Sequence, residues 1–102
     1  MPTFDRAPRF FRDWKALSGD QHALARRMIR QFIEDLTQIE QGHSQGFRHQ
    51  LRVKQVRGTD SVWEMSWDYD GRATFEYGES SIEGKMHVIW RRIGTHDVFG
   101  RP

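Results

Sequence analysis

The sequence predicts an α+β domain in which two N-terminal helices pack on one face of an antiparallel β-sheet. Apolar side chains recur at helical spacing as far as Gly42, and from Leu51 onward they alternate with polar ones as in strands. Helices followed by strands are typical of this class. The 102 residues suffice for one hydrophobic core, so we expect a single domain spanning residues 1–102.

The first helix is predicted over Ala7–Leu17. Phe10, Phe11, Trp14 and Leu17 recur there at helical spacing, which indicates a short amphipathic helix. The helix is expected to end at Ser18-Gly19-Asp20, because glycine and aspartate are typical of turns.

A longer second helix is predicted to begin at Ser18. The hydroxyl of Ser18 can cap the helix while the Gln21 side chain reaches back, as in a capping box. Gly42 and Gly46 mark the end of the helix. Apolar residues at every fourth position form a stripe that we expect to pack in the core rather than to bind a cofactor. The stripe comprises Leu24, Met28, Phe32 and Leu36.

The rest of the chain alternates like a series of strands. Residues 51–56 alternate with Arg52 and Lys54 on the polar side, which predicts a half-exposed strand with its cations outward. Val62–Trp67 and Arg72–Tyr77 predict a hairpin, because the intervening residues 68–71 have the Asp and Gly content of a tight turn. Lys85–Ile93 is nearly continuously apolar at its centre and predicts a central strand.

Composition excludes several classes of function. The chain has no cysteine, which rules out disulfides, thiol nucleophiles and cysteine-ligated zinc. The five histidines show no metal-ligand spacing, and we expect neither metal nor cofactor. No apolar run approaches the roughly 20 residues of a membrane span, and the N-terminus lacks a secretory signal, so we expect a cytoplasmic protein.

Basic residues gather in one part of the chain and predict an anion-binding face. Arg48, Arg52, Lys54 and Arg57 lie within ten residues, although the net charge is only +2. For each cation alone, an ordinary solvated surface is the simpler interpretation. Together with Arg72, which could instead pair with Glu64 across the hairpin, the set favours a phosphate site.

His96 is the main candidate for proton transfer. It follows the last strand after Gly94 and Thr95, where a loop residue can lean over the end of a sheet. An imidazole titrates near neutral pH, as a general acid or base must. Asp97 could orient it, and Tyr77 at the end of its strand could stack on a base, although an aromatic at the rim of the core is the commoner outcome.

Taken together and in their order along the chain, these segments resemble the RelE/ParE superfamily of toxins from type II toxin–antitoxin systems. The similarity covers nearly the whole chain, and its last two blocks are most similar to the actinobacterial RelE-like proteins. It is carried by the two-helix start, Leu51-Arg52-Val53-Lys54, Gly58, Val62-Trp63-Glu64-Met65, Gly71-Arg72-Ala73-Thr74-Phe75 and Ile93-Gly94-Thr95-His96-Asp97-Val98-Phe99.

The resemblance implies a helical pair on a curved antiparallel sheet and a metal-independent endoribonuclease that cuts mRNA in the ribosomal decoding site. It also implies inhibition by a cognate antitoxin protein. Lys54 and Arg52 match the basic strand of the superfamily, Arg72 the arginine on the second arm of the hairpin, and His96 a C-terminal histidine found in some branches. Glu64 resembles an acidic site residue.

We therefore expect catalysis by His96, Arg72, Lys54 and Glu64. Contacts to mRNA and ribosomal RNA are expected from Arg52, Arg48, Arg57, Tyr77 and Asp97. Several ribosome-dependent relatives carry a C-terminal tyrosine that this chain replaces with Asp97-Val98-Phe99. This departure leaves open the general base, and with it two alternatives: a ParE-like toxin that binds DNA gyrase without cleaving RNA, and a catalytically degenerate homologue that only binds an antitoxin.

Overall fold

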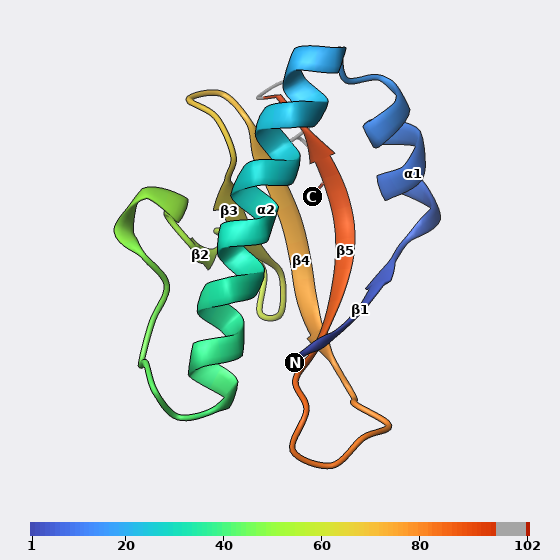
Figure 1. Ribbon diagram of the computed structural model, residues 1–102. Coiled ribbons are helices and arrows are strands. Elements are labelled where there is room, and N and C mark those ends of the chain that lie inside the picture. The colour runs from blue at the N-terminus through green and yellow to red at the C-terminus, as the bar shows by residue number, and fades with distance from the viewer. Residues whose placement is uncertain (96–101) are drawn as a thin grey trace.

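The computed structural model describes residues 1–95 and Pro102. It contains two helices on one face of a five-stranded mixed sheet, in the order β1-β5-β4-β3-β2 (Figure 1). This is the α+β architecture that the sequence predicts. No helix in the described part of the chain is long and apolar enough to cross a membrane.

The helices lie where the apolar periodicity predicts them. Helix α1 spans Pro8–Lys15 and helix α2 spans Gly19–Glu40. The predicted capping box is confirmed, because the Gln21 backbone N–H donates to Ser18 Oγ at 3.2 Å and the Ser18 N–H donates to Gln21 Oε1 at 2.8 Å. The predicted stripe is also confirmed, since Phe32 and Leu36 are fully buried while Leu24 and Met28 pack against the core.

Three of the strands follow the alternation in the sequence. Strand β3 spans Trp63–Ser66, β4 spans Arg72–Gly78 and β5 spans His87–Gly94. They pair antiparallel, with a bulge where Thr74 faces Arg92 but Phe75 faces Trp90. The indole Nε1–H of Trp67 donates to the Arg72 carbonyl at 2.9 Å and closes the hairpin end.

Two strands differ from the sequence-based expectation. Strand β1, Thr3–Arg6, was not expected; it pairs parallel with β5 and makes the sheet mixed. The strand expected over residues 51–56 is wrong in its extent, because a 3-10 helix occupies His49–Leu51 and strand β2 is only Lys54–Gln55. Leu51 is fully buried, so the need to bury this side chain overrides the local alternation.

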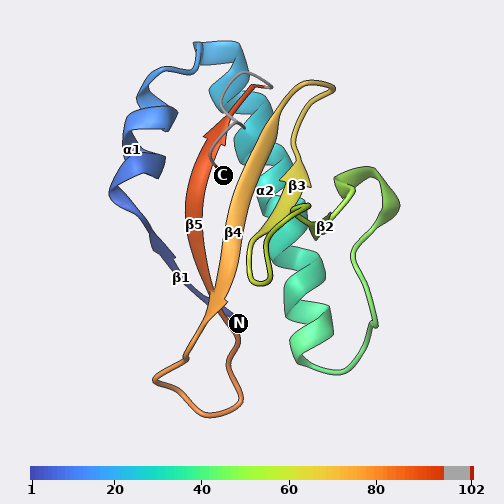
Figure 2. The same cartoon turned by 180° about the vertical axis from the view of Figure 1, so that it is seen from behind.

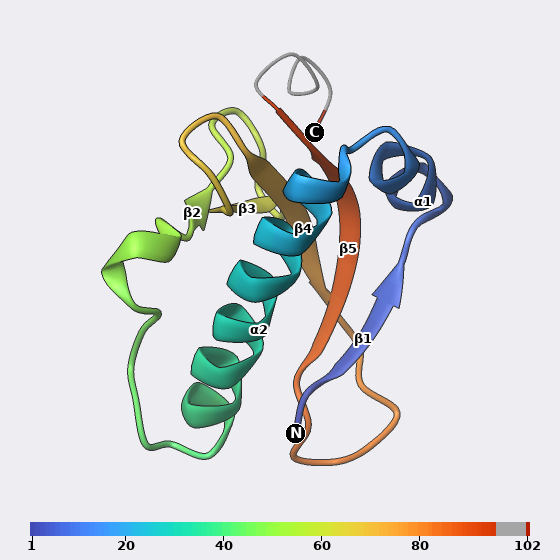
Figure 3. The same cartoon turned by 45° about the horizontal axis from the view of Figure 1, so that its top comes forward.

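The core lies between α2 and the sheet. The ring of Phe32 lies 5.0 Å from that of Phe75 and 5.1 Å from that of Trp90, in edge-on or tilted contacts that join the helix to two strands. Figure 3 shows α2 lying along the sheet, and α1 beside β1 and β5. Viewed from behind, no helix covers β3, β4 and β5 (Figure 2). We call this uncovered side the outer face.

Candidate functional site

Strand register sets a row of polar side chains on the outer face. Lys54 on β2 faces Glu64 on β3, and Glu64 faces Thr74 on β4. Their strand neighbours Trp63 and Met65 point to the opposite side and pack in or against the core. Because side chains alternate along a strand, the row lies on the face that the helices leave open.

Lys54 and Glu64 form an ion pair beside a hollow. Lys54 Nζ lies 3.6 Å from a carboxylate oxygen of Glu64; the lysine side chain is 62% exposed and the glutamate side chain 17%. The hollow has a volume of about 560 Å³ and is also lined by Arg57 and Pro102. Two cations and a carboxylate around one open space can hold a phosphate and accept or donate a proton.

Arg72 belongs to the same face but turns toward its own hairpin. It lies opposite Ser66, two residues from Glu64 along β3. Its Nη1 donates to the carbonyl oxygens of Asp68, Tyr69 and Gly71 at 3.2, 3.0 and 2.9 Å. The alternative pairing of Arg72 with Glu64 is therefore absent from the described structure, where the partner of Glu64 is Lys54.

Arg52 does not lie on the outer face, which corrects the expectation that it lines up with Lys54 and Arg72. It follows the 3-10 helix in the left-handed conformation, at φ 47°. Its side chain instead lines a second hollow of about 440 Å³ together with Arg48 and Tyr77, near the C-terminal end of α2. The basic cluster in the sequence is thus divided between two surfaces.

Arg48 holds the loop after α2 in place. Its guanidinium donates to Asp35 at 2.8 and 2.9 Å and to Glu34 at 3.1 Å, and its backbone N–H also donates to Asp35. The hydrogen bonds from Arg48 lower the pKa of Asp35, against a smaller opposing effect of burial. A guanidinium committed to two carboxylates is a structural anchor in this conformation.

Tyr77 lies at the rim of the core. Its ring makes edge-on contacts with the rings of Trp63, at 6.1 Å between centroids, and of Phe75, at 5.6 Å. Tyr77 also pairs across the sheet with the buried Val88 of β5 and lies on the same face of the sheet as that residue. Burial raises the pKa of the Tyr77 phenol, which remains neutral at physiological pH. Tyr77 is therefore placed for stacking beside Arg52, away from Lys54.

His96 and Asp97 lie outside the described residues. Pro102 lies against the outer face, where its carbonyl oxygen accepts hydrogen bonds from Thr74 Oγ at 3.3 Å and from Arg91 Nε at 3.2 Å. Within the described residues, no group of three or more His, Cys, Asp or Glu side chains is arranged to hold a metal ion.

Two arginines on β5 were not singled out from the sequence. Arg91 occupies the bulge and pairs with Glu76 at 3.0 Å on the outer face. Arg92 binds Asp13 of α1 with two hydrogen bonds of 2.9 and 2.8 Å. Burial alone would raise the pKa of Asp13, but hydrogen bonds from Arg92 and the Ile93 backbone outweigh it and lower that pKa. The signal in the sequence that could have identified them is the pair of consecutive arginines within an otherwise apolar strand.

Comparison with known proteins gives a fold but no sequence relative. No family model and no curated protein matches the chain. Among solved structures, the E. coli DinJ–YafQ toxin–antitoxin complex contains a chain that matches with a TM-score of 0.59 at 11% identity, covering 96% of both chains. A metal-bound toxin from Helicobacter pylori matches with a TM-score of 0.58 at 11% identity, covering 97% of this chain and 99% of the other.

The YoeB dimer from Staphylococcus aureus is a further match. Its TM-score is 0.53 at 12% identity, over 93% of this chain and 97% of the other. The first of these three neighbours is part of a toxin–antitoxin complex and the second is a toxin. Almost the full length of each chain is covered, so the match includes the helices and the sheet together. The chain therefore has the same fold as these three solved structures.

Proposed function

We propose that this protein is the toxin of a type II toxin–antitoxin pair and a metal-independent endoribonuclease that cleaves mRNA on the ribosome. The observation that carries the proposal is the Lys54–Glu64 ion pair on the outer face, beside a hollow that Arg57 also lines. The RelE-like fold supports the toxin assignment. The site supports phosphodiester chemistry, because it joins cations to a carboxylate on an open surface.

In the proposed reaction, the 2′-oxygen of a ribose attacks the adjacent phosphorus. The 2′-hydroxyl gives its proton to a base, the bond from phosphorus to the 5′-oxygen breaks, and the leaving oxygen takes a proton from an acid. The products are a 2′,3′-cyclic phosphate and a 5′-hydroxyl end. Lys54 and Arg57 hold the phosphate, and Arg72 stabilises the charge that builds up in the transition state.

His96 is proposed as the general acid or base, and Glu64 as a carboxylate of the site. Both groups can exchange protons, and an imidazole titrates closest to neutral pH. Arg52 and Tyr77, on the second hollow, are proposed to contact RNA away from the cleaved bond, by charge and by stacking. Arg48 and Asp97 would add weaker contacts.

A non-enzymatic toxin is the second candidate, and a specific observation favours it. Nη1 of Arg72 is bound to three carbonyl oxygens of its own hairpin. A guanidinium that is already used within the chain suits a surface that binds a protein, such as DNA gyrase, or a degenerate homologue that only binds an antitoxin. Both candidates predict an antitoxin partner, but only the enzyme predicts new RNA ends.

The test is a cell-free translation system in which mRNA ends are mapped after addition of the purified protein. We expect new 5′-hydroxyl ends within coding regions, and a fall of about 10²- to 10⁴-fold in cleavage for His96→Gln. The control is Lys15→Ala, which alters an exposed residue at the end of α1 and should leave cleavage at the parental rate. If expression of the protein in cells inhibits growth and the translation assay yields no new RNA ends, the protein-binding candidate is favoured.

A further inference from the structure

The second hollow, near the C-terminal end of α2, combines aromatic rings with cations. Its volume is about 440 Å³, which is within the range of pockets that bind small organic ligands. Of the described residues that line it, none is acidic. The aromatic residues are Phe47, Trp63 and Tyr77, and the basic ones are Arg48, His49 and Arg52. These walls suit an anionic ligand that also carries a flat aromatic group.

The aromatic rings of this hollow remain accessible for stacking. The Trp63 and Tyr77 rings meet at an interplanar angle of 68°, so the edge of one ring meets the face of the other. At least one ring of the pair therefore keeps both of its faces out of this contact. Tyr77 is 40% exposed and Trp63 is half-buried. A nucleobase can stack on this pair without separating two stacked rings.

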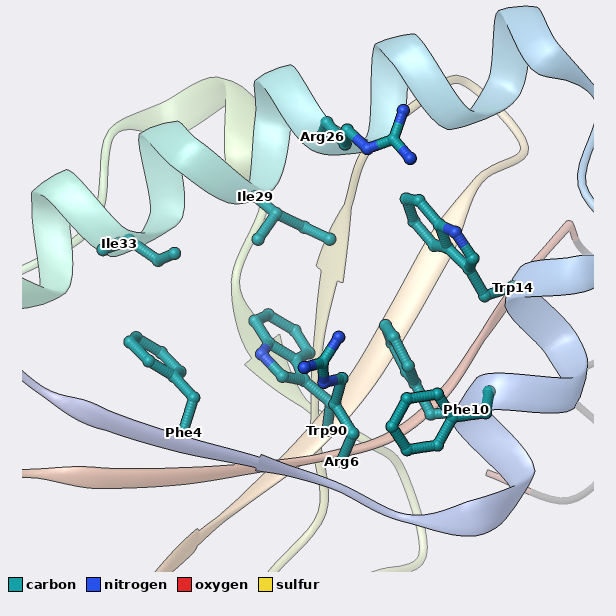
Figure 4. Close-up of a pocket in the computed structure, with 9 residues that line it drawn as sticks. Phe4, Arg6, Phe10, Trp14, Arg26, Ile29, Ile33 and Trp90 are labelled. Carbon is teal, nitrogen blue, oxygen red and sulfur yellow. The ribbon is translucent and has the colours of Figure 1, made fainter.

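The apolar groove between α1, α2 and β1 differs in this respect (Figure 4). Its accessible indole, that of Trp14, is stacked on His22 with the ring centroids 4.6 Å apart. The guanidinium carbon of Arg26 also lies 5.2 Å from the centre of the Trp14 ring. A base would have to displace one of these contacts in order to stack there. Of these two hollows, the second is the better fit to a nucleobase.

Arg52 brings an uncommitted positive charge to the second hollow. Its side chain is exposed and has no acidic partner among the described residues, whereas Arg48 binds both Asp35 and Glu34. The imidazole of His49 is exposed as well and makes no hydrogen bond within the described part of the chain. The N–H groups of Arg52 and His49 are therefore available to a phosphate.

The backbone at Arg52 takes a conformation that favours glycine. Its φ is 47°, and among the described residues it is the only non-glycine residue with a positive φ. A Cβ raises the energy of this left-handed conformation, which glycine adopts freely. Residues held in such conformations gather at binding and catalytic sites. The strain at Arg52 therefore points to a role of its side chain in binding rather than in stability.

The second hollow and the proposed site meet at one edge of the sheet. Strand β2 is the last in the order of the strands, and Lys54 on it lines the hollow of the outer face, while the preceding residue, Val53, lines the second hollow. On β3, Glu64 and Trp63 divide in the same way. A single strand of RNA that crosses the β2 edge therefore meets both hollows, whereas a duplex would have to unpair a base to fill the second.

We propose that the second hollow is a subsite for one unpaired nucleotide of an RNA strand. The base stacks on the Trp63–Tyr77 pair, and the phosphate binds Arg52 and His49. Accessible rings favour a base over an acidic peptide, which would use the cations alone. The inference rests on the proposed function for the choice of RNA as the ligand. It extends that function, because it assigns a nucleotide away from the cleaved bond, and binding there requires no cleavage.

The test titrates the isotopically labelled protein with adenosine 5′-monophosphate (AMP) and follows binding by NMR. We expect AMP to shift the resonances of Trp63, Tyr77 and Arg52. Adenosine and ribose 5-phosphate should each bind at least about tenfold more weakly, since each lacks one of the two recognised groups. Equal binding of ribose 5-phosphate and AMP, or no shift at about 10 mM AMP, would overturn the proposal. Shifts of the hollow by an acidic peptide but not by AMP would show a protein-binding surface and overturn it as well.

Arg52→Gly separates binding from folding. Because glycine adopts the left-handed conformation freely, this variant should be at least as stable as the parent in thermal unfolding, yet bind AMP about tenfold more weakly. Arg52→Lys should recover part of the binding, since it keeps the charge. Parental binding of AMP by Arg52→Gly would contradict the proposal, and a large loss of stability would make Arg52 a structural residue instead.

Tyr77 tests the stacking contact. Tyr77→Leu should weaken AMP binding about tenfold, whereas Tyr77→Phe keeps the ring and should bind within about twofold of the parent. Tyr69→Leu is the matched control, because Tyr69 is 88% exposed and does not line the hollow. It should also bind AMP within about twofold of the parent. Equal weakening by Tyr77→Leu and Tyr69→Leu would contradict the stacking contact.

Mapping of mRNA ends separates the subsite from the proposed ribonuclease. Arg52→Gly and Tyr77→Leu should raise the mRNA concentration for half-maximal cleavage about tenfold and lower the maximal rate by a smaller factor. Binding of AMP in the hollow by a protein that produces no new RNA ends would support the subsite and contradict the proposed function. New RNA ends from a protein whose second hollow AMP does not perturb would support the ribonuclease and contradict the subsite.

Discussion

The two faces of the sheet use the same strands for different purposes. On the helix-covered face, Phe75 of β4 packs against Phe32 of α2 and is fully buried. On the outer face, the next residue of the same strand, Glu76, pairs with Arg91, and the one before, Thr74, lies in the row with Glu64. Because side chains alternate along a strand, one strand supplies both a part of the core and a part of the proposed site. Substitutions on the helix-covered face are therefore expected to affect stability, and substitutions on the outer face to affect activity.

The largest expected effect is on the helix-covered face. Phe32→Ala removes a fully buried ring that contacts Phe75 and Trp90, so the free energy of unfolding should fall by about 3–5 kcal/mol. Chemical denaturation followed by circular dichroism measures it. Tyr69→Ala is the control, because Tyr69 is 88% exposed and its removal should change the free energy by less than about 0.5 kcal/mol. Equal effects of the two changes would contradict the assignment of the core.

On the outer face, Arg72 should affect cleavage more than folding. Arg72→Ala is expected to reduce the rate of mRNA cleavage by about 10²-fold through lost stabilisation of the transition state. Arg72→Lys should recover part of that loss, because lysine keeps the charge and loses the planar fork. Cleavage rates of the three proteins on one mRNA measure the effect, and unaltered cleavage by Arg72→Ala would remove Arg72 from the site.

The hairpin that carries Arg72 depends on a close approach at Gly71. A Cβ at this position would lie 2.5 Å from the buried indole of Trp67, so Gly71→Ala should cost about 1–3 kcal/mol of stability by overpacking. Gly46→Ala is the matched control, since a Cβ there meets nothing within 4 Å. Thermal unfolding of both variants compares them. A Gly71→Ala protein as stable as the Gly46→Ala protein would show that the hairpin can shift without cost.

A smaller effect on stability is expected when the pH is lowered. The pKa of Asp13 is lowered in the folded protein, so its ionised form contributes stability above the unfolded pKa of about 4, and this contribution is lost as pH falls through the folded pKa. Asp13→Asn should therefore cost about 1 kcal/mol near neutral pH and less at about pH 3. Denaturation curves at both pH values test the sign. A cost that grew toward low pH would contradict it.

The sequence predicted the elements that depend on local periodicity and failed where distant contacts decide. Helix α2 and strands β3 and β4 carry their own signal, in the capping box and in the alternation. Strand β1 has only four residues, and it pairs in parallel with β5, more than eighty positions away. Its pairing depends on a neighbour that the local sequence cannot identify.

The candidate site divides in the same way. Lys54 points outward as the sequence predicted, and the alternation along β3 places Glu64 opposite it, although β2 itself has only two residues. Arg52 was misplaced because it follows the 3-10 helix His49–Leu51 and itself takes the left-handed conformation, which changes the direction of the chain just before β2. The partner of Arg48 could not be predicted from the sequence either, since the loop after α2 brings Arg48 back to Asp35 on the helix. The role of His96 stays a prediction.

The most direct measurement of the central claim is a paired assay of cleavage and stability for Lys54→Ala and Glu64→Gln. If the outer face is the reactive one, mRNA cleavage should fall by about 10²-fold or more in each variant. The free energy of unfolding should change by less than about 1 kcal/mol, because the ion pair is partly exposed. Cleavage at the parental rate by both variants would contradict the account.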